Sequence, residues 1–146
     1  MAATVFRLTP LWFRLVGLLF TLWGAAGVFA FYAHVVTGPA QLAAMPDYDR
    51  AYFLALPDWF VWIYGLATWG GLLGGIALLL RRRFATILFV LSLIAVVVQF
   101  GWVFAATDLI AAKGAATVVP FPLVIFAVAL IQLAVARHAD ARGWLR

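Results

Sequence analysis

Residues 59–106 read WFVWIYGLATWGGLLGGIALLL-RRR-FATILFVLSLIAVVVQFGWVFAA, two long apolar runs separated only by three arginines. A helix needs about 20 apolar residues to cross a bilayer, because each residue rises about 1.5 Å through roughly 30 Å of hydrocarbon. Arginine side chains are costly in hydrocarbon, so Arg81, Arg82 and Arg83 predict a short turn at a membrane surface. The stretch therefore predicts two antiparallel transmembrane helices, over residues 59–80 and 84–106.

Two further apolar runs, residues 15–36 and 118–136, extend this pattern to the whole chain, and all four runs lack Asp, Glu, Lys and Arg. The composition agrees, because 68% of the residues are hydrophobic and 10% are charged, against about a quarter charged in soluble domains. A soluble domain of this size could not bury so much apolar surface. The expected fold class is all-α, a four-helix transmembrane bundle forming one domain over residues 1–146.

The N-terminal run has a second interpretation, because Arg7 and Arg14 followed by an apolar stretch that ends in VFA at residues 28–30 are also typical of a secretory signal. The apolar stretch is longer than an ordinary signal core, which favours a retained helix.

The charges predict the orientation. One predicted side carries eight basic residues and a single acid, Asp140, whereas the other carries Arg50 and Lys113 with four acids. Short loops rich in Lys and Arg face the cytoplasm. We therefore expect both termini in the cytoplasm, with the protein in a bacterial inner membrane. The residues that set this orientation at the lipid headgroups include Arg81, Arg82, Arg83, Arg137, Arg142 and Arg146.

The sequence lacks the residue patterns of common catalytic and metal sites. It has no cysteine, and no paired nucleophile and base, phosphate-binding loop or cluster of metal ligands is recognisable in it. The predicted spans hold no carboxylate for proton coupling. We expect no enzyme activity, no cofactor, no bound metal and no nucleic-acid partner.

The loop over residues 37–58 predicts a short helix between Pro46 and Pro57, because Tyr48, Tyr52, Phe53 and Leu56 share a face at helical spacing. Such a helix would lie along the membrane surface. Two interpretations are open: an aromatic anchor, or a lid over an external pocket.

Glycines mark one face of the predicted second helix, which contains GGLLGG at residues 70–75. Small residues four apart let helix backbones approach closely. The partner surface could lie in the same chain or on another protein. The predicted packing residues are Gly24, Gly27, Gly70, Gly71, Gly74 and Gly75.

A few side chains are candidates for ligand or pigment contact, namely His34, Trp69, Gln99, Trp102 and Gln132. The deep tryptophans, which include Trp23, could line a pocket for a flat apolar ligand or fill the core. His34 could ligate a haem or chlorin, or bond to headgroups and loop acids. Gln99 and Gln132 could fix helix register. If these two faced a shared cavity with Trp102, that would favour a carrier.

Several motifs carry a resemblance to a known group of proteins. They are AQLAAMP at residues 40–46, LPDW at 56–59, LLLRRRFAT at 78–86, LSL at 91–93, VQ at 98–99 and RGWLR at 142–146. Together they resemble small bacterial four-helix inner-membrane proteins of unknown function, often loosely labelled "sugar transporter". Members often have an Asn after the tryptophan of the first helix, whereas Gly24 follows Trp23 here.

The functional expectation is a non-enzymatic accessory or structural subunit that associates with a larger membrane complex or with itself. One alternative is a small homo-oligomeric carrier. The other is a pigment- or quinone-binding subunit of an energy-transducing complex.

Overall fold

Four long helices dominate the structure, a computed structural model that describes residues 8–146. They are α1 (Leu11–Val35), α4 (Asp58–Leu79), α5 (Ala85–Ala106) and α8 (Pro120–Ala141). Each is long and apolar enough to cross a membrane, and no strand occurs among the described residues. The expectation of four such helices in an all-α fold is confirmed. The first begins at Leu11 rather than at residue 15, and the last continues to Ala141 rather than ending at 136.

Four short helices lie in the two loops at one end of the bundle. Helices α2 (Pro39–Ala44) and α3 (Asp47–Leu54) connect α1 to α4, whereas α6 (Leu109–Lys113) and α7 (Ala115–Val118) connect α5 to α8. Helix α3 is the short helix expected after Pro46. Helices α2, α6 and α7 were not expected, because segments of four to six residues are too short to show a hydrophobic period.

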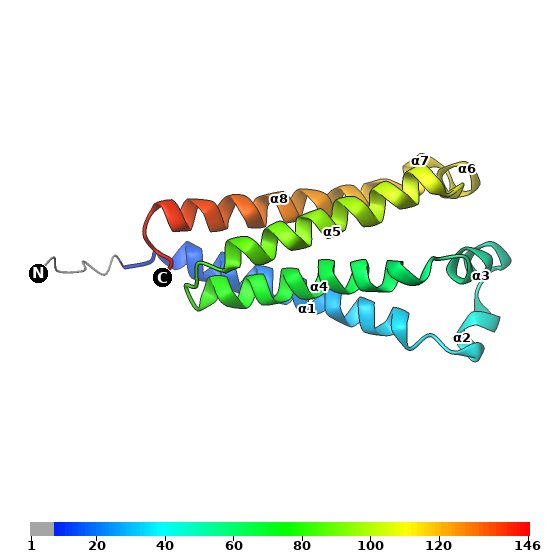
Figure 1. Cartoon of the computed structure of the whole chain (residues 1–146), viewed down its shortest axis with the longest axis horizontal. Helices are drawn as coiled ribbons and strands as arrows, with labels where there is room; N and C mark the ends of the chain where they lie inside the picture. The colour runs from blue at the N-terminus through cyan, green and yellow to red at the C-terminus, as the bar shows by residue number, and fades with distance from the viewer. Residues whose placement is uncertain (1–7) are drawn as a thin grey trace, which may run out of the picture.

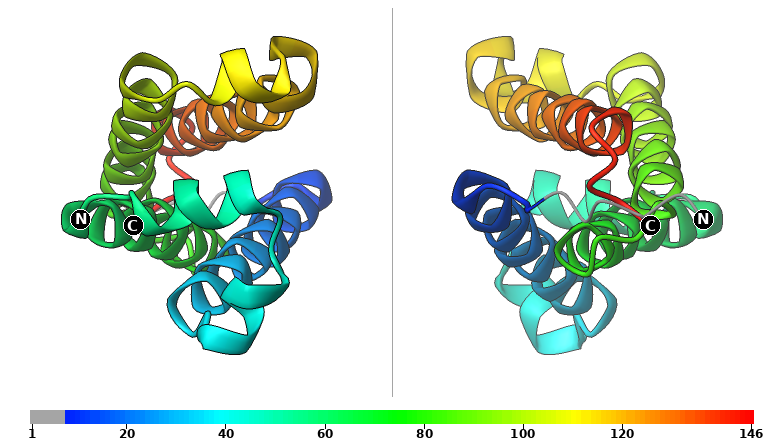
Figure 2. Two further views of the ribbon diagram at one scale, coloured as in Figure 1. Left: turned by 90° about the vertical axis from the view of Figure 1, so that its right-hand side faces the viewer. Right: turned by 90° about the vertical axis from the view of Figure 1, so that its left-hand side faces the viewer.

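The long helices pack in series, α1 on α4, α4 on α5, and α5 on α8. Helices α4 and α5 lie close together near the end that holds the chain termini, and they diverge towards α3 and α6 (Figure 1). Seen along the bundle, the α1–α4 pair and the α5–α8 pair face each other across a gap (Figure 2). The bundle is therefore two helix pairs joined along one edge.

Glycines explain the close α1–α4 and α4–α5 contacts. A Cβ added at Gly24 would stand 2.4 Å from Cα of Leu72, and one at Gly75 would stand 2.8 Å from the backbone N of Thr21. On the other side, a Cβ at Gly74 would stand 2.6 Å from the ring of Phe89. The glycine face of α4 is thus used within the chain. Helix α8 contains no glycine, and the residues it buries are three alanines and Gln132.

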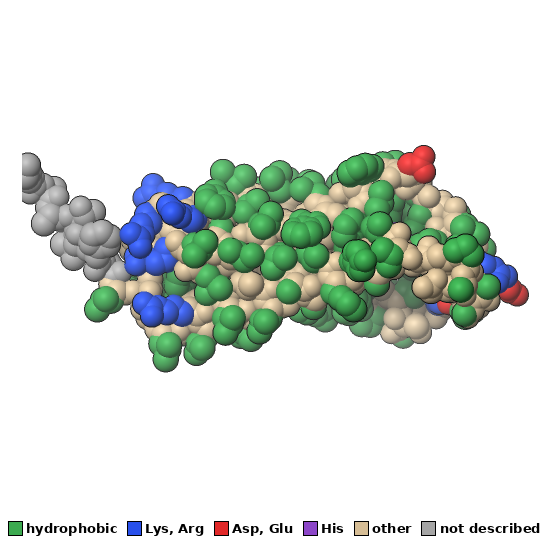
Figure 3. All heavy atoms as spheres, turned by 90° about the horizontal axis from the view of Figure 1, so that it is seen from below, with side chains coloured by type: hydrophobic (Ala, Val, Ile, Leu, Met, Phe, Trp, Pro, Cys, Tyr) green, Lys and Arg blue, Asp and Glu red, His purple; other side chains and the backbone are tan. Residues whose placement is uncertain are grey.

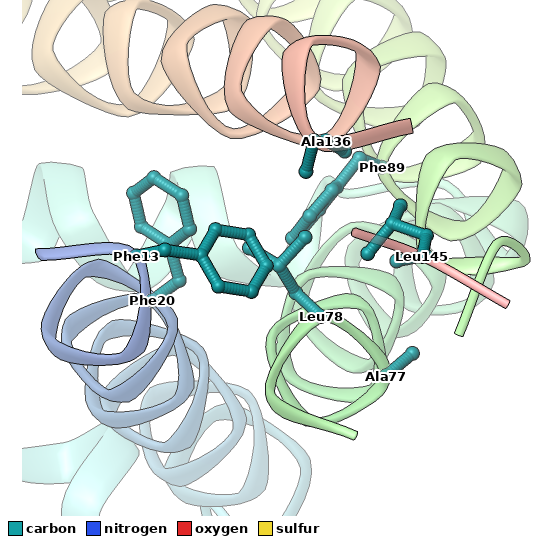
Figure 4. Close-up of a cluster of buried hydrophobic side chains, with 9 residues drawn as sticks. Phe13, Phe20, Ala77, Leu78, Phe89, Ala136 and Leu145 are labelled. Carbon is teal, nitrogen blue, oxygen red and sulfur yellow. The ribbon is translucent and has the colours of Figure 1, made fainter. Parts of the chain in front are cut away.

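A compact apolar core holds the two pairs together near the termini. Side chains from all four long helices meet there, including Phe13, Phe20, Leu78, Phe89 and Ala136 (Figure 4). The rings of Phe20 and Phe89 make an edge-on contact with 6.1 Å between centroids. Since buried aromatic and leucine side chains supply most of the packing energy, this core is the fixed point of the fold.

The C-terminal tail completes this core. Leu145 is 3% exposed and belongs to the same cluster. The tail pairs with the α4–α5 turn, because Arg81 Nε donates to the carbonyl of Trp144 at 2.7 Å and the Arg146 N–H donates to the carbonyl of Arg81, also at 2.7 Å. Arg81 adopts a φ of 59° at this turn. The tail therefore closes the bundle at this end.

The charged residues separate to the two ends, with an apolar belt between them (Figure 3). We call the end with the termini the basic end; it holds Arg14, Arg81, Arg82, Arg83, Arg137, Arg142 and Arg146, and Arg83 pairs there with Asp140 at 3.2 Å. The opposite, acidic end holds Asp47, Asp49, Asp58 and Asp108 with Arg50 and Lys113. Arg7 lies outside the described residues.

Candidate functional site: a cavity between the helix pairs

A cavity of about 450 Å³ lies between the α1–α4 and α5–α8 pairs. All four long helices contribute to its lining, together with α3, α6 and α7. It forms because the glycine face holds α4 close to α1 and to α5, whereas α8 is packed mainly on α5. Small-molecule sites commonly enclose about 300–1,000 Å³, so the volume fits a ligand of modest size.

The cavity wall is mainly apolar and aromatic, and no Asp, Glu, Lys or Arg lines it. Phe60 and Tyr64 of α4 and Phe100 and Phe104 of α5 all line it. His34 of α1 also lines it, with its ring centroid 4.7 Å from that of Phe53 and 5.4 Å from that of Tyr64. No hydrogen bond joins this His to a loop acid among the described residues, so it lies within an aromatic cluster.

Three buried polar side chains line the inner part of the cavity. Ser92 and Gln99 of α5 are 4% and 7% exposed, and Gln132 of α8 is 3% exposed. The Ser92 hydroxyl donates to the carbonyl of Ala67 at 2.6 Å, which links α5 to α4. Gln132 Nε2 is buried and has no hydrogen-bond partner among the residues described. Gln132 therefore lines the cavity with a carboxamide that makes no hydrogen bond within the described residues.

The two glutamines lie at different depths in the bundle. Gln99 is two helical turns from Ser92 along α5, roughly 10 Å at 1.5 Å per residue. Gln132 stands closer to the basic end of α8 than to its start. Both line the same cavity, and no hydrogen bond joins their side chains within the described chain.

The tryptophan candidates are placed differently. Trp23 lines the cavity and is 38% exposed. Trp69 is 45% exposed and lies outside the lining. Trp102 packs on Trp59 and Phe60, with ring centroids 5.5 and 5.8 Å apart, and faces a second hollow beneath α3. Sequence reasoning did not identify the wall residues of α5, because Phe100 and Phe104 are indistinguishable in the sequence from bilayer-facing aromatics.

Helix α3 covers the cavity at the acidic end. Tyr52, Phe53 and Leu56 line the cavity, so the aromatic face expected in this loop is turned towards the bundle. Asp47, at the start of α3, pairs with Arg50 at 2.5 Å. Of the two interpretations of this segment, the lid fits this placement.

Two polar contacts tie α3 to the opposite loop. The Tyr48 hydroxyl donates to Asp108 at 2.8 Å, and the Lys113 ammonium pairs with Asp49. Partial burial and the Asp108 carboxylate raise the pKa of Tyr48 to about 12. The phenol therefore keeps its proton, and with it this hydrogen bond, throughout the physiological pH range.

Comparison with protein-family models, with curated proteins and with solved structures found no match. The resemblance to small bacterial four-helix membrane proteins stays a prediction.

Proposed function

We propose that the chain is a non-enzymatic multi-pass membrane protein that binds a small, mostly apolar molecule in the cavity between its two helix pairs. One observation carries the proposal: Gln99 and Gln132 line an otherwise mainly apolar cavity, and neither carboxamide makes a hydrogen bond within the described residues. A buried polar group without a partner costs about 1–3 kcal/mol. A ligand that forms a hydrogen bond with one of these carboxamides would recover part of this cost.

The apolar belt and the separated charges support membrane insertion and an orientation. Because basic loops face the cytoplasm, the basic end would be cytoplasmic, and the lid α3 would be periplasmic in a bacterial inner membrane. The chain has no cysteine. Cysteines introduced one at a time can therefore report which end of the bundle faces the outside. On intact cells, a membrane-impermeant maleimide should label Ala111→Cys at the acidic end and spare Ala141→Cys at the basic end; the reverse pattern would refute the orientation.

A carrier is the second candidate, favoured by the two glutamines that share a cavity closed at one end, although Trp102, the third residue expected there, lines the second hollow instead. Transport would require the closed end to open, with loss of the Arg81–Trp144 contact and separation of the core around Phe89. The cavity lies within one chain, so a carrier of this design would not need a second copy to form its site. A pigment- or quinone-binding role would use the same cavity.

An accessory role in a larger complex stays a prediction, and it is compatible with ligand binding. A native gel of protein extracted in mild detergent addresses it directly. Stoichiometric foreign subunits in the band would support it. A band of this chain alone would leave the cavity as the basis for function.

The binding proposal is tested by filling the cavity. Ala26 of α1 is exposed and lines the cavity, whereas its neighbour Ala25 is exposed and does not. Native mass spectrometry of the wild-type protein should detect a co-purifying small molecule. Ala26→Phe should lower its occupancy by about tenfold or more, equivalent to about 1.4 kcal/mol, and Ala25→Phe should retain it. An empty wild-type protein, or equal occupancy in both variants, would contradict the proposal.

A further inference from the structure

The cavity between the helix pairs opens sideways, and this opening indicates where its ligand comes from. We infer that the ligand is an uncharged amphiphile dissolved in the bilayer, whose apolar chain leaves the cavity between α1 and α8. The inference rests on the proposed function and adds the chemical class of the ligand and its source. It follows from the exposure, the charge and the length of the cavity lining.

The exposed part of the lining lies on α1 and α8 alone. Among the described residues, those that line the cavity and are also exposed are Trp23, Ala26 and Ala30 of α1 and Phe121 of α8. The lining residues of α3, α4 and α5 are all buried or half-buried. Helices α1 and α8 face each other across a gap and do not pack along their lengths (Figure 2). The cavity therefore opens sideways between these two helices.

The side opening lies in the half of the bundle nearer the acidic end. Phe121 is the second residue of α8, and Ala30 lies five residues before the end of α1. At the basic end, rings join the two helices: the centroids of Trp12 in α1 and His138 in α8 are 6.4 Å apart, and both rings contact Trp144 of the tail. The opening is thus at the depth of one leaflet, the periplasmic one in the proposed orientation.

The lining excludes a charged ligand. No Asp, Glu, Lys or Arg contributes to it, and an ion transferred into such surroundings would lose its hydration without gaining a counter-charge. The one basic side chain of the lining, His34, lies within the aromatic cluster. Gln99 and Gln132 provide carboxamides that make no hydrogen bond within the described residues. The polar part of the ligand is therefore uncharged and able to form hydrogen bonds.

The lining is elongated along the bundle. It follows α5 from Ser92 to Phe104 and α1 from Trp23 to His34, lengths of about 18 and 16 Å at 1.5 Å per residue. A volume of about 450 Å³ spread over this length suits an extended apolar chain. Methylene groups that pass through the opening leave one apolar environment for another, because lipid tails are as apolar as the side chains of the wall. The site therefore accepts a chain longer than the cavity itself.

The test varies the chain length at a fixed polar group. Tritium-labelled 1-octanol and 1-hexadecanol are titrated into the protein in phosphatidylcholine nanodiscs, with binding to empty nanodiscs subtracted and affinity expressed against the mole fraction in lipid. A hydroxyl both donates and accepts, so these probes make no choice between the oxygen and the nitrogen of a carboxamide. The wild type should bind both alcohols with similar affinity. A loss of about tenfold for hexadecanol, or about 1.4 kcal/mol, would show a cavity closed at the side and overturn the inference.

Two substitutions on α1 form a matched pair. Ala30 and Ala33 are both exposed, but only Ala30 lines the cavity. Ala30→Trp should obstruct the opening, so that hexadecanol binding falls by about tenfold or more, equivalent to about 1.4 kcal/mol, while octanol binding is retained. Ala33→Trp should bind both alcohols as the wild type does. An equal effect of Ala30→Trp on the two alcohols would overturn the side opening.

A third probe with the same chain tests the charge. Hexadecyltrimethylammonium should bind at least about tenfold more weakly than hexadecanol, a difference of about 1.4 kcal/mol, and equal binding would overturn the uncharged class. A wild type that binds no alcohol, yet carries a co-purifying molecule that Ala26→Phe removes, would overturn the inference and leave the proposed function in place. A wild type that binds no alcohol and carries no co-purifying molecule would overturn both.

Discussion

Gln132 and Thr86 share one local feature but differ in their surroundings. Each has a buried polar atom without a partner among the described residues. Of the two residues, only Gln132 also lines the cavity. Unsatisfied buried groups are rare in folded proteins because they cost about 1–3 kcal/mol. A ligand in the cavity can form a hydrogen bond with the carboxamide of Gln132, which is why the proposal includes this residue.

The titration of Tyr48 reports the hydrogen bond to Asp108 that ties the lid α3 to the opposite loop. Its pKa of about 12 lies above the ordinary value of 10.0, through partial burial first and the Asp108 carboxylate next. Since the folded-state pKa is the higher one, the stabilisation is complete below pH 10 and is lost as the pH rises through about 12. Asp108→Asn should lower the pKa of Tyr48. Absorbance at 295 nm follows the phenolate, and Tyr48→Phe identifies its step. An unchanged titration in Asp108→Asn would show that the two side chains are not in contact.

At the scale of helices, the glycines decide which pairs are close. Gly24 is the sharpest case, because an added Cβ would meet backbone atoms of Leu72 rather than a movable side chain.

Gly24→Ala should therefore force α1 away from α4 and destabilise the fold by about 1–3 kcal/mol, the usual cost of overpacking. Gly101 of α5 is the matched control, because nothing lies within 4 Å of an added Cβ there. Gly101→Ala should be neutral or slightly stabilising, since alanine favours helix more than glycine does. Denaturant unfolding in detergent measures both. Equal effects of the two substitutions would contradict the close crossing.

The sequence predicts the four long helices well, because one physical constraint dominates in each of them. The long apolar runs and the arginine turn identify the four helices, because bilayer thickness and the cost of buried charge leave few alternatives. The placement of Trp69 and Trp102 could not be predicted in this way. In a helix that is apolar on all sides, hydrophobic periodicity does not distinguish a residue facing another helix from one facing lipid.

For the whole molecule, the main feature is the contrast between its two ends. The basic end is closed by the core around Phe89 and by the tail residue Leu145. The acidic end is covered by α3, which is held to the opposite loop by two surface polar contacts. Exposed contacts of this type contribute about 0–1 kcal/mol each. These two polar contacts alone therefore do little to hold the cover in place.

The cavity itself could not have been predicted from the sequence. It depends on how far α5 diverges from α4 and on the packing of α8 mainly on α5, and neither feature leaves a local pattern in the sequence. The sequence identifies the two glutamines as candidates for ligand contact. That they line one cavity depends on how the helices cross. The sequence does show the aromatic face of α3. Its role as a lid follows only from its position over the cavity, which the sequence does not show.

The most direct test of the account is an experimental structure of the protein grown from a lipid mesophase at a resolution that shows bound small molecules. The account predicts density in the cavity with a polar group within hydrogen-bond distance of the carboxamide of Gln99 or Gln132. A structure in which α8 packs against α1, the cavity is absent and Gln132 bonds to a neighbouring helix would contradict it.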